Sequence, residues 1–304
     1  MSASFCAFPG NEDFARRLRE ALVLGATRLH WRRFPDGESY LRFEDSPAGR
    51  HLIVVCSLNE PDSKAQALLF AAATARELGA ASVGLVAPYL GYMRQDRRFR
   101  DGEAVTSALF AAQLSAAFDW LITVDAHLHR RKSLSEIYSI PARDVSGSAG
   151  VSAWIAANVE RPLVVGPDSE SERWAAAVAA GAGAPHVSLR KVRSGDRDVH
   201  IEAPELGAWR GRTPVLVDDI ISTARTMAAA ARRLQELGFP PPSCVGVHGV
   251  FADDALDVLQ RAGVSRIVTT NTIAHATNAI DVSAQVAEAI ESQLSAPGPS
   301  GREA

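Results

Sequence analysis

Short apolar runs alternate with longer alanine- and leucine-rich segments along almost the whole chain, and this alternation restricts the fold more than any other feature. The apolar runs have the length of strands and occupy residues 52–56, 83–88, 121–125, 163–167, 186–190, 215–217, 244–250 and 266–269. The segments between them have the length of helices, as at 65–78, 107–117, 175–181, 227–237 and 254–262. Strands that alternate with helices form a parallel sheet covered on both faces. The sequence therefore predicts an α/β fold.

The alternation occurs twice, before and after about residue 145, which predicts two similar doubly wound parallel-sheet domains. We place the first domain at 1–146 and the second at 147–280. Residues 146–150 (Ser-Gly-Ser-Ala-Gly) are the expected linker, because small flexible residues punctuate structure. A helix at 281–294 is expected to join the first domain.

Two segments depart from the alternation. Residues 31–43 surround the turn Pro35-Asp36-Gly37 and predict a hairpin at the edge of the first domain. Residues 295–304 are rich in Pro, Gly, Ser and Ala, so we expect a disordered tail.

Composition excludes several classes of protein. The chain has 304 residues, 47% of them hydrophobic, which is enough to bury two cores. A net charge of −3 argues against general nucleic-acid binding. No apolar run approaches the roughly 20 residues that span a bilayer, and the first residues lack the pattern of a signal peptide. We therefore expect a cytoplasmic protein with neither nucleic acid nor membrane as a partner.

Two rare residue types provide further information. Cys6, Cys56 and Cys244 have no zinc or disulfide spacing, so we expect buried free thiols. Only three of the 32 basic residues are lysines, namely Lys64, Lys132 and Lys191. Because lysine and arginine differ in shape and hydration, a site that needs a compact ammonium group is one reason to retain a lysine.

Residues 214–226 carry the most informative motif. An apolar strand ends in Asp218 and Asp219, and a hydroxyl-rich turn then begins a helix. The carboxyl end of a buried parallel strand is where α/β sheets bind ligands, and a helix start attracts phosphate. We predict that the two carboxylates hold sugar hydroxyls and that a phosphate binds the turn Ser222, Thr223, Ala224, Arg225 and Thr226. The alternative is a surface turn with two solvated acids.

Two further motifs follow predicted strands. Residues 87–103 contain four arginines within seven residues, a density that suits a polyphosphate because guanidinium groups bind phosphate oxygens in pairs: Arg94, Arg97, Arg98 and Arg100. The alternative is a solvated basic loop. His127 lies in Thr-Val-Asp-Ala-His-Leu-His at the next strand end, where it would ligate a metal or contact a nucleotide phosphate, or be a structural histidine.

The last two motifs lie at turns. Phe34, Asp36 and Glu38 offer an aromatic ring and two carboxylates to an adenine, or form a plain hairpin turn. Lys191 and Arg193 precede a polar, glycine-containing loop, an arrangement typical of a mobile catalytic flap, although an ordinary charged loop has the same composition.

Taken in order, these five motifs resemble the ribose-phosphate pyrophosphokinases, or phosphoribosyl pyrophosphate (PRPP) synthetases. The resemblance covers about residues 5–294 and implies two domains of the type I phosphoribosyltransferase kind. It implies transfer of the diphosphoryl group of ATP to the C1 hydroxyl of ribose 5-phosphate, giving PRPP and AMP. It also implies a homo-oligomer, either a dimer or a multiple of it such as a hexamer.

The resemblance also implies a role for each matching residue. Adenine contacts Phe34, Asp36 and Glu38, often from a neighbouring subunit, while the rest of ATP contacts Arg94, Gln95, Asp96 and His127. Magnesium is held at His127 and Asp168. Ribose 5-phosphate binds Asp218, Asp219 and the turn 222–226, and Lys191 and Arg193 stabilise the charge of the transition state.

The sequence departs from the family pattern in two places. Glu170 and Glu172 stand where many members have a glycine pair, and they bring negative charge toward a pyrophosphate region. Arg225 stands where a glycine usually allows the backbone to approach phosphate. Two other functions therefore stay open: a non-catalytic regulatory homologue, and a phosphoribosyltransferase that consumes PRPP.

Overall fold

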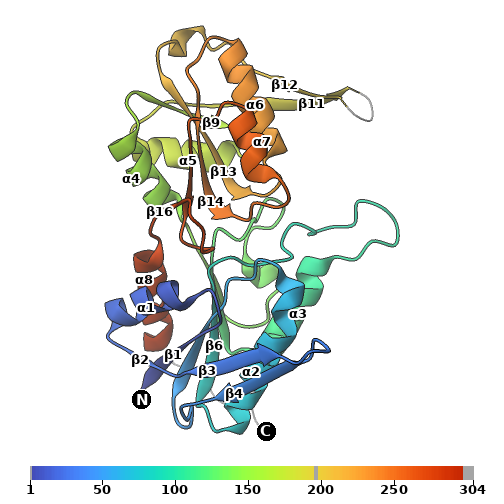
Figure 1. Cartoon of the computed structure of the whole chain (residues 1–304), viewed down its shortest axis with the longest axis vertical. Helices are drawn as coiled ribbons and strands as arrows, with labels where there is room; N and C mark the ends of the chain where they lie inside the picture. Colours follow the sequence, from blue (N-terminus) through green and yellow to red (C-terminus); the bar gives the residue numbers. More distant parts are fainter. Residues whose placement is uncertain (1, 195–197, 297–304) are drawn as a thin grey trace. The chain divides into compact units, whose positions relative to one another are not determined.

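The computed structural model describes residues 2–194 and 198–296, without the side chains of residues 191–200. The chain divides into two compact units, one from the N-terminus to Val145 with the chain from Ser283 onward, and one from Ser146 to Val282. Each unit contains a six-stranded parallel sheet (Figure 1). The predicted α/β class with two parallel-sheet domains is confirmed.

Unit 1 has the strand order β2-β1-β5-β6-β7-β8. The strands are β1 (Ala3–Ala7), β2 (Gly25–Ala26), β5 (His51–Val55), β6 (Ser82–Ala87), β7 (Trp120–Val124) and β8 (Ala142–Val145). Its helices are α1 (Glu12–Leu22), α2 (Ala65–Glu77), α3 (Thr106–Ala117) and α8 (Ser283–Ser295). Figure 1 shows α8 in red beside α1 in blue, so the two ends of the described chain pack together.

Unit 2 has the strand order β10-β9-β13-β14-β15-β16. The strands are β9 (Pro162–Gly166), β10 (His186–Ser188), β13 (Thr213–Ile221), β14 (Ser243–Gly249), β15 (Arg266–Thr270) and β16 (Asn278–Ile280). Its helices are α4 (Ser148–Asn158), α5 (Glu172–Ala182), α6 (Arg225–Glu236) and α7 (Ala255–Arg261). A separate hairpin consists of β11 (Arg190–Ser194) and β12 (Asp198–Glu202).

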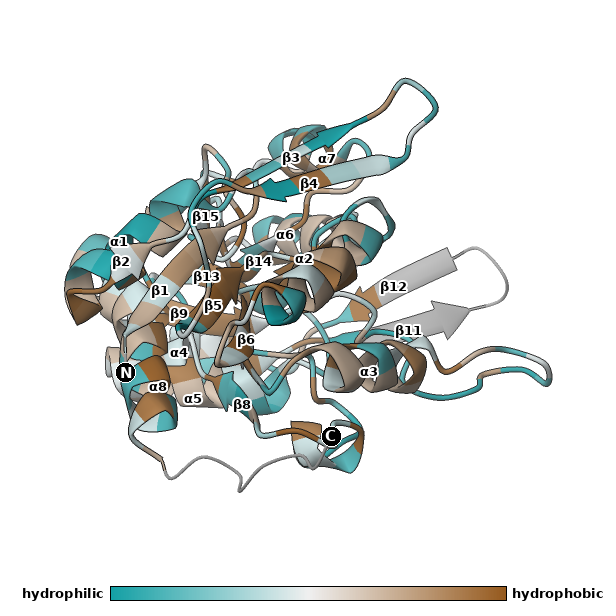
Figure 2. Ribbon diagram, turned by 90° about the horizontal axis from the view of Figure 1, so that it is seen from below, coloured by the Kyte–Doolittle hydropathy of each residue, from teal (hydrophilic) through white to brown (hydrophobic). Residues whose placement is uncertain are grey.

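The central strands are buried and apolar, which explains why the sequence identified them. In β5, Leu52, Ile53, Val54 and Val55 have no exposed surface, and Figure 2 colours this strand as hydrophobic. Strands covered on both faces lose the polar alternation of half-exposed strands and become continuous apolar runs. The three cysteines are buried free thiols, as expected.

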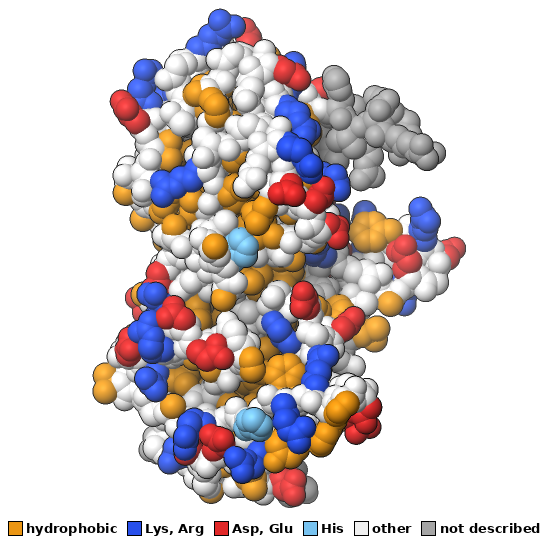
Figure 3. Space-filling view, in the orientation of Figure 1, with side chains coloured by type: hydrophobic (Ala, Val, Ile, Leu, Met, Phe, Trp, Pro, Cys, Tyr) orange, Lys and Arg blue, Asp and Glu red, His pale blue; other side chains and the backbone are white. Residues whose placement is uncertain are grey.

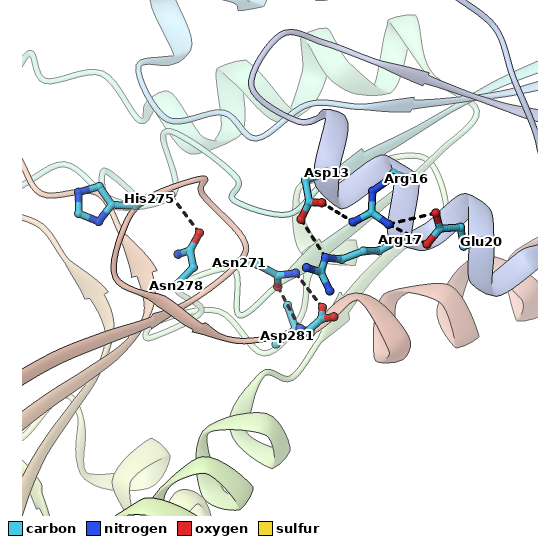
Figure 4. A network of polar contacts seen from close by, with 9 residues as sticks. Asp13, Arg16, Arg17, Glu20, Asn271, His275, Asn278 and Asp281 are labelled. Atoms are coloured by element: carbon cyan, nitrogen blue, oxygen red, sulfur yellow. Dashed lines mark hydrogen bonds and ion pairs between the residues drawn. The ribbon is translucent and has the colours of Figure 1, made fainter.

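Charged residues lie on the surface of both units. On the face shown in Figure 3, acidic and basic side chains are interspersed. Helix α1 shows the local pattern, because Arg16 lies 2.5 Å from Asp13 and 2.8 Å from Glu20, and Arg17 lies 2.9 Å from Asp13 (Figure 4). Among the residues that the structure describes, no helix combines the length and apolarity of a membrane span.

The predicted hairpin is confirmed: β3 (Leu29–Arg33) and β4 (Ser39–Phe43) form an antiparallel two-stranded sheet of their own that packs against α2. Two other local predictions were wrong in detail. The expected linker 146–150 is partly helical, since α4 begins at Ser148 after the Ser146 hydroxyl accepts the Ser148 N–H. The expected strand 186–190 is two strands, divided at the buried Leu189.

Candidate active site

The carboxylates of Asp218 and Asp219 lie inside β13 and not beyond its end. The prediction ended the strand at 217, but β13 continues to Ile221 and pairs with β14 as far as Gly249. The strand continues because β14 is itself long and provides hydrogen-bonding partners. Both aspartates are half-buried, and the Asp219 N–H donates to the Asp218 carboxylate over 3.0 Å.

A third carboxylate belongs to the same group. Burial raises the pKa of Asp218 well above its usual range, and the negative charges of Asp219 and then Asp168 raise it further. Asp168 follows β9, so three acidic side chains from two neighbouring strands share one region of unit 2. Such a group favours a proton or a cation.

The loop after β9 is held in place by short polar contacts. The Asp168 carboxylate accepts the N–H groups of Glu170 at 3.0 Å and Ser171 at 3.2 Å. A Cβ atom on Gly166 would lie 2.7 Å from the Ser171 hydroxyl, so this position requires glycine. Glu170 and Glu172, which depart from the family pattern, are exposed to solvent.

The turn between β13 and α6 contains a backbone conformation that favours glycine, and it falls on Ala224. Ala224 has φ 58° and ψ 6°, in the left-handed region, and its carbonyl accepts the first helical hydrogen bond of α6 from Ala228. Helix α6 therefore begins at Arg225, two residues before the prediction. Arg225 itself has no positive φ, so its backbone does not need glycine.

The side chain of Arg225 contacts α7. Its Nη2 atom lies 3.1 Å from the Asp254 carboxylate, whose other oxygen lies 3.2 Å from Arg261. Two-thirds of the Arg225 side chain (66%) is exposed. The guanidinium group thus links the starts of two helices.

In unit 1, the arginine-rich loop follows β6. Arg94, Arg97, Arg98 and Arg100 are exposed. Asp96 differs from them because only 3% of its side chain is exposed, and its carboxylate forms an ion pair with Arg130 at 3.2 Å. The carbonyl of Asp96 also accepts a hydrogen bond from Arg131 at 3.2 Å. Asp96 therefore anchors two arginines that the sequence analysis missed, and the Arg130-Arg131 pair after the histidine motif was the available signal.

The segment after β7 has an unusual backbone. Asp125 and His127 have φ values of 37° and 55°, and the His127 ring packs edge-on against His129 with 4.1 Å between centroids. Asp144 accepts the Ala126 N–H at 3.0 Å. Although Asp144 is exposed as a whole, loss of solvent around its carboxyl group and the charge of Asp125 raise its pKa to about 7. Asp144 was also missed, whereas His129 belongs to the histidine motif that the sequence indicated.

The β3–β4 hairpin presents Phe34, Asp36 and Glu38 at an exposed tip. The tip is closed by a hydrogen bond from the Phe34 N–H to the Glu38 carbonyl at 2.8 Å. The guanidinium of Arg32 lies over the rings of both Phe34 and Tyr40, at 4.4 and 4.6 Å from their centroids. This cation–π contact orients Phe34 while leaving 39% of it exposed.

The predicted catalytic pair lies on a strand. Lys191 and Arg193 belong to β11, where their backbones pair with Ile201 and Val199 of β12. Their side chains lie outside the described part of the structure, as do residues 195–197 of the predicted flap. The backbone alternation places both residues on the same face of this hairpin.

The predicted residues therefore fall into two groups. Unit 2 brings together Asp168, Asp218, Asp219 and the turn 222–226, while unit 1 contains the hairpin tip, the arginine-rich loop and His127. These residues lie near or after the carboxyl ends of parallel strands, except for those at the tip of the separate β3–β4 hairpin.

Comparisons with known proteins cover both units. Residues 4–117 match the family model described as the N-terminal domain of ribose phosphate pyrophosphokinase, and residues 133–286 match the phosphoribosyl transferase domain. The ribose-phosphate pyrophosphokinase of Methanopyrus kandleri is 35% identical over 279 residues, which cover 91% of this chain and 94% of that protein. The same-named protein of Methanosarcina mazei is 34% identical and covers 93% of each chain.

A solved structure shows the same fold. The crystal structure of phosphoribosylpyrophosphate synthetase from Mycobacterium smegmatis has a TM-score of 0.85 and 24% sequence identity with this chain. The match covers 97% of this chain and 99% of the other.

Proposed function

The chain belongs to the ribose-phosphate pyrophosphokinase family, and from this membership we propose that it transfers the diphosphoryl group of ATP to the C1 hydroxyl of ribose 5-phosphate, giving PRPP and AMP. The membership confirms the family resemblance and the enzyme class predicted from the motifs. One observation supports this reaction most directly: two carboxylates in β13 lead through a short turn into the start of α6.

Unit 2 is the acceptor side in this proposal. Asp218 and Asp219 accept hydrogen bonds from the ribose hydroxyls, and the turn 222–226 binds the 5-phosphate through hydroxyl and backbone N–H groups. Arg225 contributes its backbone N–H and not its guanidinium group, which is engaged by Asp254. Glu170 and Glu172 are exposed and not buried at this turn.

Unit 1 is the donor side. Phe34 stacks on adenine while Asp36 and Glu38 accept hydrogen bonds from it. Arg94, Gln95 and His127 bind ATP at the strand ends. Asp96, buried in its ion pair with Arg130, supports this surface instead of contacting the nucleotide.

The chemistry is an in-line displacement at phosphorus. The C1 oxygen attacks the β-phosphorus, the bond from that phosphorus to the oxygen of the α-phosphate breaks, and AMP leaves with the electron pair. The hydroxyl proton passes to solvent. Such a transfer needs positioning and positive charge more than covalent help from the protein. Lys191 and Arg193 provide that charge.

Magnesium fits the carboxylates of unit 2 better than it fits His127. Magnesium prefers oxygen ligands, and imidazole suits softer metals. Burial raises the pKa of Asp218 and the charges of Asp219 and Asp168 raise it further, and a divalent cation would neutralise this negative charge. Asp168, as predicted, would therefore hold the ion with at most one neighbouring carboxylate and with phosphate oxygens of the substrates. The ion would supply charge neutralisation and orient those oxygens. His127 would contact the nucleotide phosphates.

The proposal includes a cytoplasmic homo-oligomer, either a dimer or a multiple of it. The exposed hairpin tip supports this assembly, because Phe34, Asp36 and Glu38 are available to complete the adenine site of a second copy.

A direct assay tests the function. Purified protein is incubated with ATP, magnesium and ribose 5-phosphate, and the products are identified by ³¹P NMR and chromatography. Formation of AMP and PRPP in equal amounts is expected, and Asp219→Asn is expected to weaken ribose 5-phosphate binding. Absence of both products with intact ATP binding would favour a regulatory homologue. Consumption of PRPP with a nucleobase would identify a phosphoribosyltransferase.

A further inference from the structure

We propose that residues 59–64, the support segment, set the positions of both ATP-side segments of unit 1, and that Lys64 is the positioning residue that fixes the support segment. This inference rests on the proposed function, because it concerns the ATP side of that reaction. The support segment connects β5 to α2 and includes the short helix η1 (Pro61–Ser63).

The side chain of Lys64, at the end of the support segment, bonds back to residues at its start. Its ammonium group donates to the Ser57 carbonyl at 2.8 Å and to the Asn59 side-chain oxygen at 2.7 Å. The Lys64 N–H donates to the Pro61 carbonyl at 3.0 Å, and the Lys64 carbonyl accepts from Leu68 of α2 at 2.9 Å. One residue thus joins the end of β5, the segment and the helix.

The position suits lysine and not arginine. Lys64 is half-buried, and burial lowers the pKa of its ammonium group. A compact ammonium group can donate to both of these acceptors, which lie close together at the end of the lysine side chain. A planar guanidinium group is larger and has fixed donor directions. This accounts for one of the three lysines retained in an arginine-rich chain.

The support segment contacts the arginine-rich loop. Tyr92 lies two residues before Arg94, and its hydroxyl donates to the Asp62 carboxylate. A Cβ atom on Gly91 would lie 2.7 Å from the Leu58 carbonyl and 3.1 Å from the Pro61 ring, so the loop backbone packs directly against the segment. The position of Arg94 and Gln95 therefore depends on that of the support segment.

The support segment also contacts the hairpin. Arg33 immediately precedes Phe34, and its guanidinium group donates to the Ser63 carbonyl. Both segments assigned to ATP thus contact the same short piece of backbone. Binding residues held within about 0.5 Å of their productive positions need such a supporting layer. Loss of the Lys64 contacts should impair ATP binding selectively, because no acceptor-side residue belongs to unit 1.

The test compares Lys64→Met, which keeps the length of the side chain and removes its donors, with Lys132→Met, an exposed lysine of the same unit. Lys64→Met should raise the KM for ATP about tenfold, while kcat and the KM for ribose 5-phosphate change less than about twofold. Lys132→Met should leave all three unchanged. Direct titration with a fluorescent ATP analogue, without ribose 5-phosphate, should show the same loss of affinity.

Tyr92→Phe provides an independent variant if Lys64→Met does not fold, and it should raise the KM for ATP about threefold or more. An unchanged ATP affinity in the folded variants, or an equal rise in the KM of both substrates, would overturn the inference. The titration separates this inference from the proposed function: wild-type protein that binds ATP but forms no PRPP refutes the function alone.

Discussion

The side chain of Arg225 stabilises the contact between α6 and α7, and truncating it should leave ribose 5-phosphate binding intact. The opposite expectation is that Arg225 binds the phosphate of the substrate, because it lies in the turn 222–226 and a guanidinium group beside a helix start is well suited to bind phosphate. In the structure the group lies 3.1 Å from Asp254 and points its charge at α7. Arg225→Ala removes this ion pair, and Arg225→Gly also restores the residue usual in the family.

The size of each effect follows from the contacts. An exposed ion pair contributes about 0.2–1 kcal/mol, and Asp254 keeps its second partner Arg261. We expect Arg225→Ala to lower the free energy of unfolding by about 0.5 kcal/mol. Glycine in a helix costs up to about 1 kcal/mol more, so Arg225→Gly should cost about 1.5 kcal/mol. These values correspond to about 1–2 °C and 3–6 °C in Tm.

The assay combines thermal unfolding with steady-state kinetics. Arg232→Ala, an exposed arginine further along α6, controls for the general loss of a positive charge. The KM for ribose 5-phosphate should stay within about twofold of the wild-type value in all three variants, since none removes a phosphate ligand. High salt should reduce the Tm difference of Arg225→Ala, because screening weakens an exposed ion pair.

One result would refute this reasoning. If Arg225→Ala raised the KM for ribose 5-phosphate tenfold or more with little change in Tm, the guanidinium group would leave Asp254 to bind phosphate. The glycine usual in the family would then be replaced by a cation with a function of its own.

Three further predictions concern charge. Because the pKa of Asp218 is raised in the folded state, its contribution to stability is present at low pH and is lost as the pH rises through the folded-state pKa. Asp218→Asn removes this titration, so it should raise Tm more at pH 8 than at pH 4. An equal change in Tm at both pH values would contradict the raised pKa. Lys191→Ala should lower kcat by about 100- to 1,000-fold with ATP affinity retained, as rapid-quench and binding measurements would show. Removing magnesium with EDTA should abolish product formation, and calorimetry should show that Asp168→Asn weakens magnesium binding in the absence of substrates.

The sequence predicted the fold well where strands are fully buried. Residues 52–56 are apolar throughout, and residues 244–250 are apolar except for His248, because helices cover both faces of each sheet; the structure places β5 and β14 within a residue of these bounds. The first strand, Ala3–Ala7, and helix α4 escaped prediction. Their sequences, Ala-Ser-Phe-Cys-Ala and a Gly- and Ser-containing stretch, resemble loops, and only tertiary packing makes them regular.

The candidate site was predictable in its residue types but not in its pairings. Motifs identified Asp218 and Arg225, because acidic and basic residues at strand ends have few structural reasons to be there. Nothing in the sequence indicated that Arg225 contacts Asp254, 29 positions away, or that Asp96 is buried against Arg130. Such pairings depend on the positions of loops, which are set by backbone contacts that no local pattern encodes. Lys64 combines both cases. The scarcity of lysine in the sequence distinguishes this residue, but only the structure shows its contacts with Ser57 and Asn59.

The two units share one architecture but differ in the charge of the side chains near their strand ends. In unit 1, the strand ends and the hairpin provide exposed arginines, and the acidic Asp96 is already neutralised by Arg130. In unit 2, the corresponding strand ends provide Asp168, Asp218 and Asp219, and the nearby Arg225 is turned toward Asp254. Exposed cations suit a polyphosphate, whereas carboxylates suit sugar hydroxyls and magnesium. Under the proposed function, the charge that would oppose each substrate is thus held in an ion pair, Asp96 with Arg130 in unit 1 and Arg225 with Asp254 in unit 2.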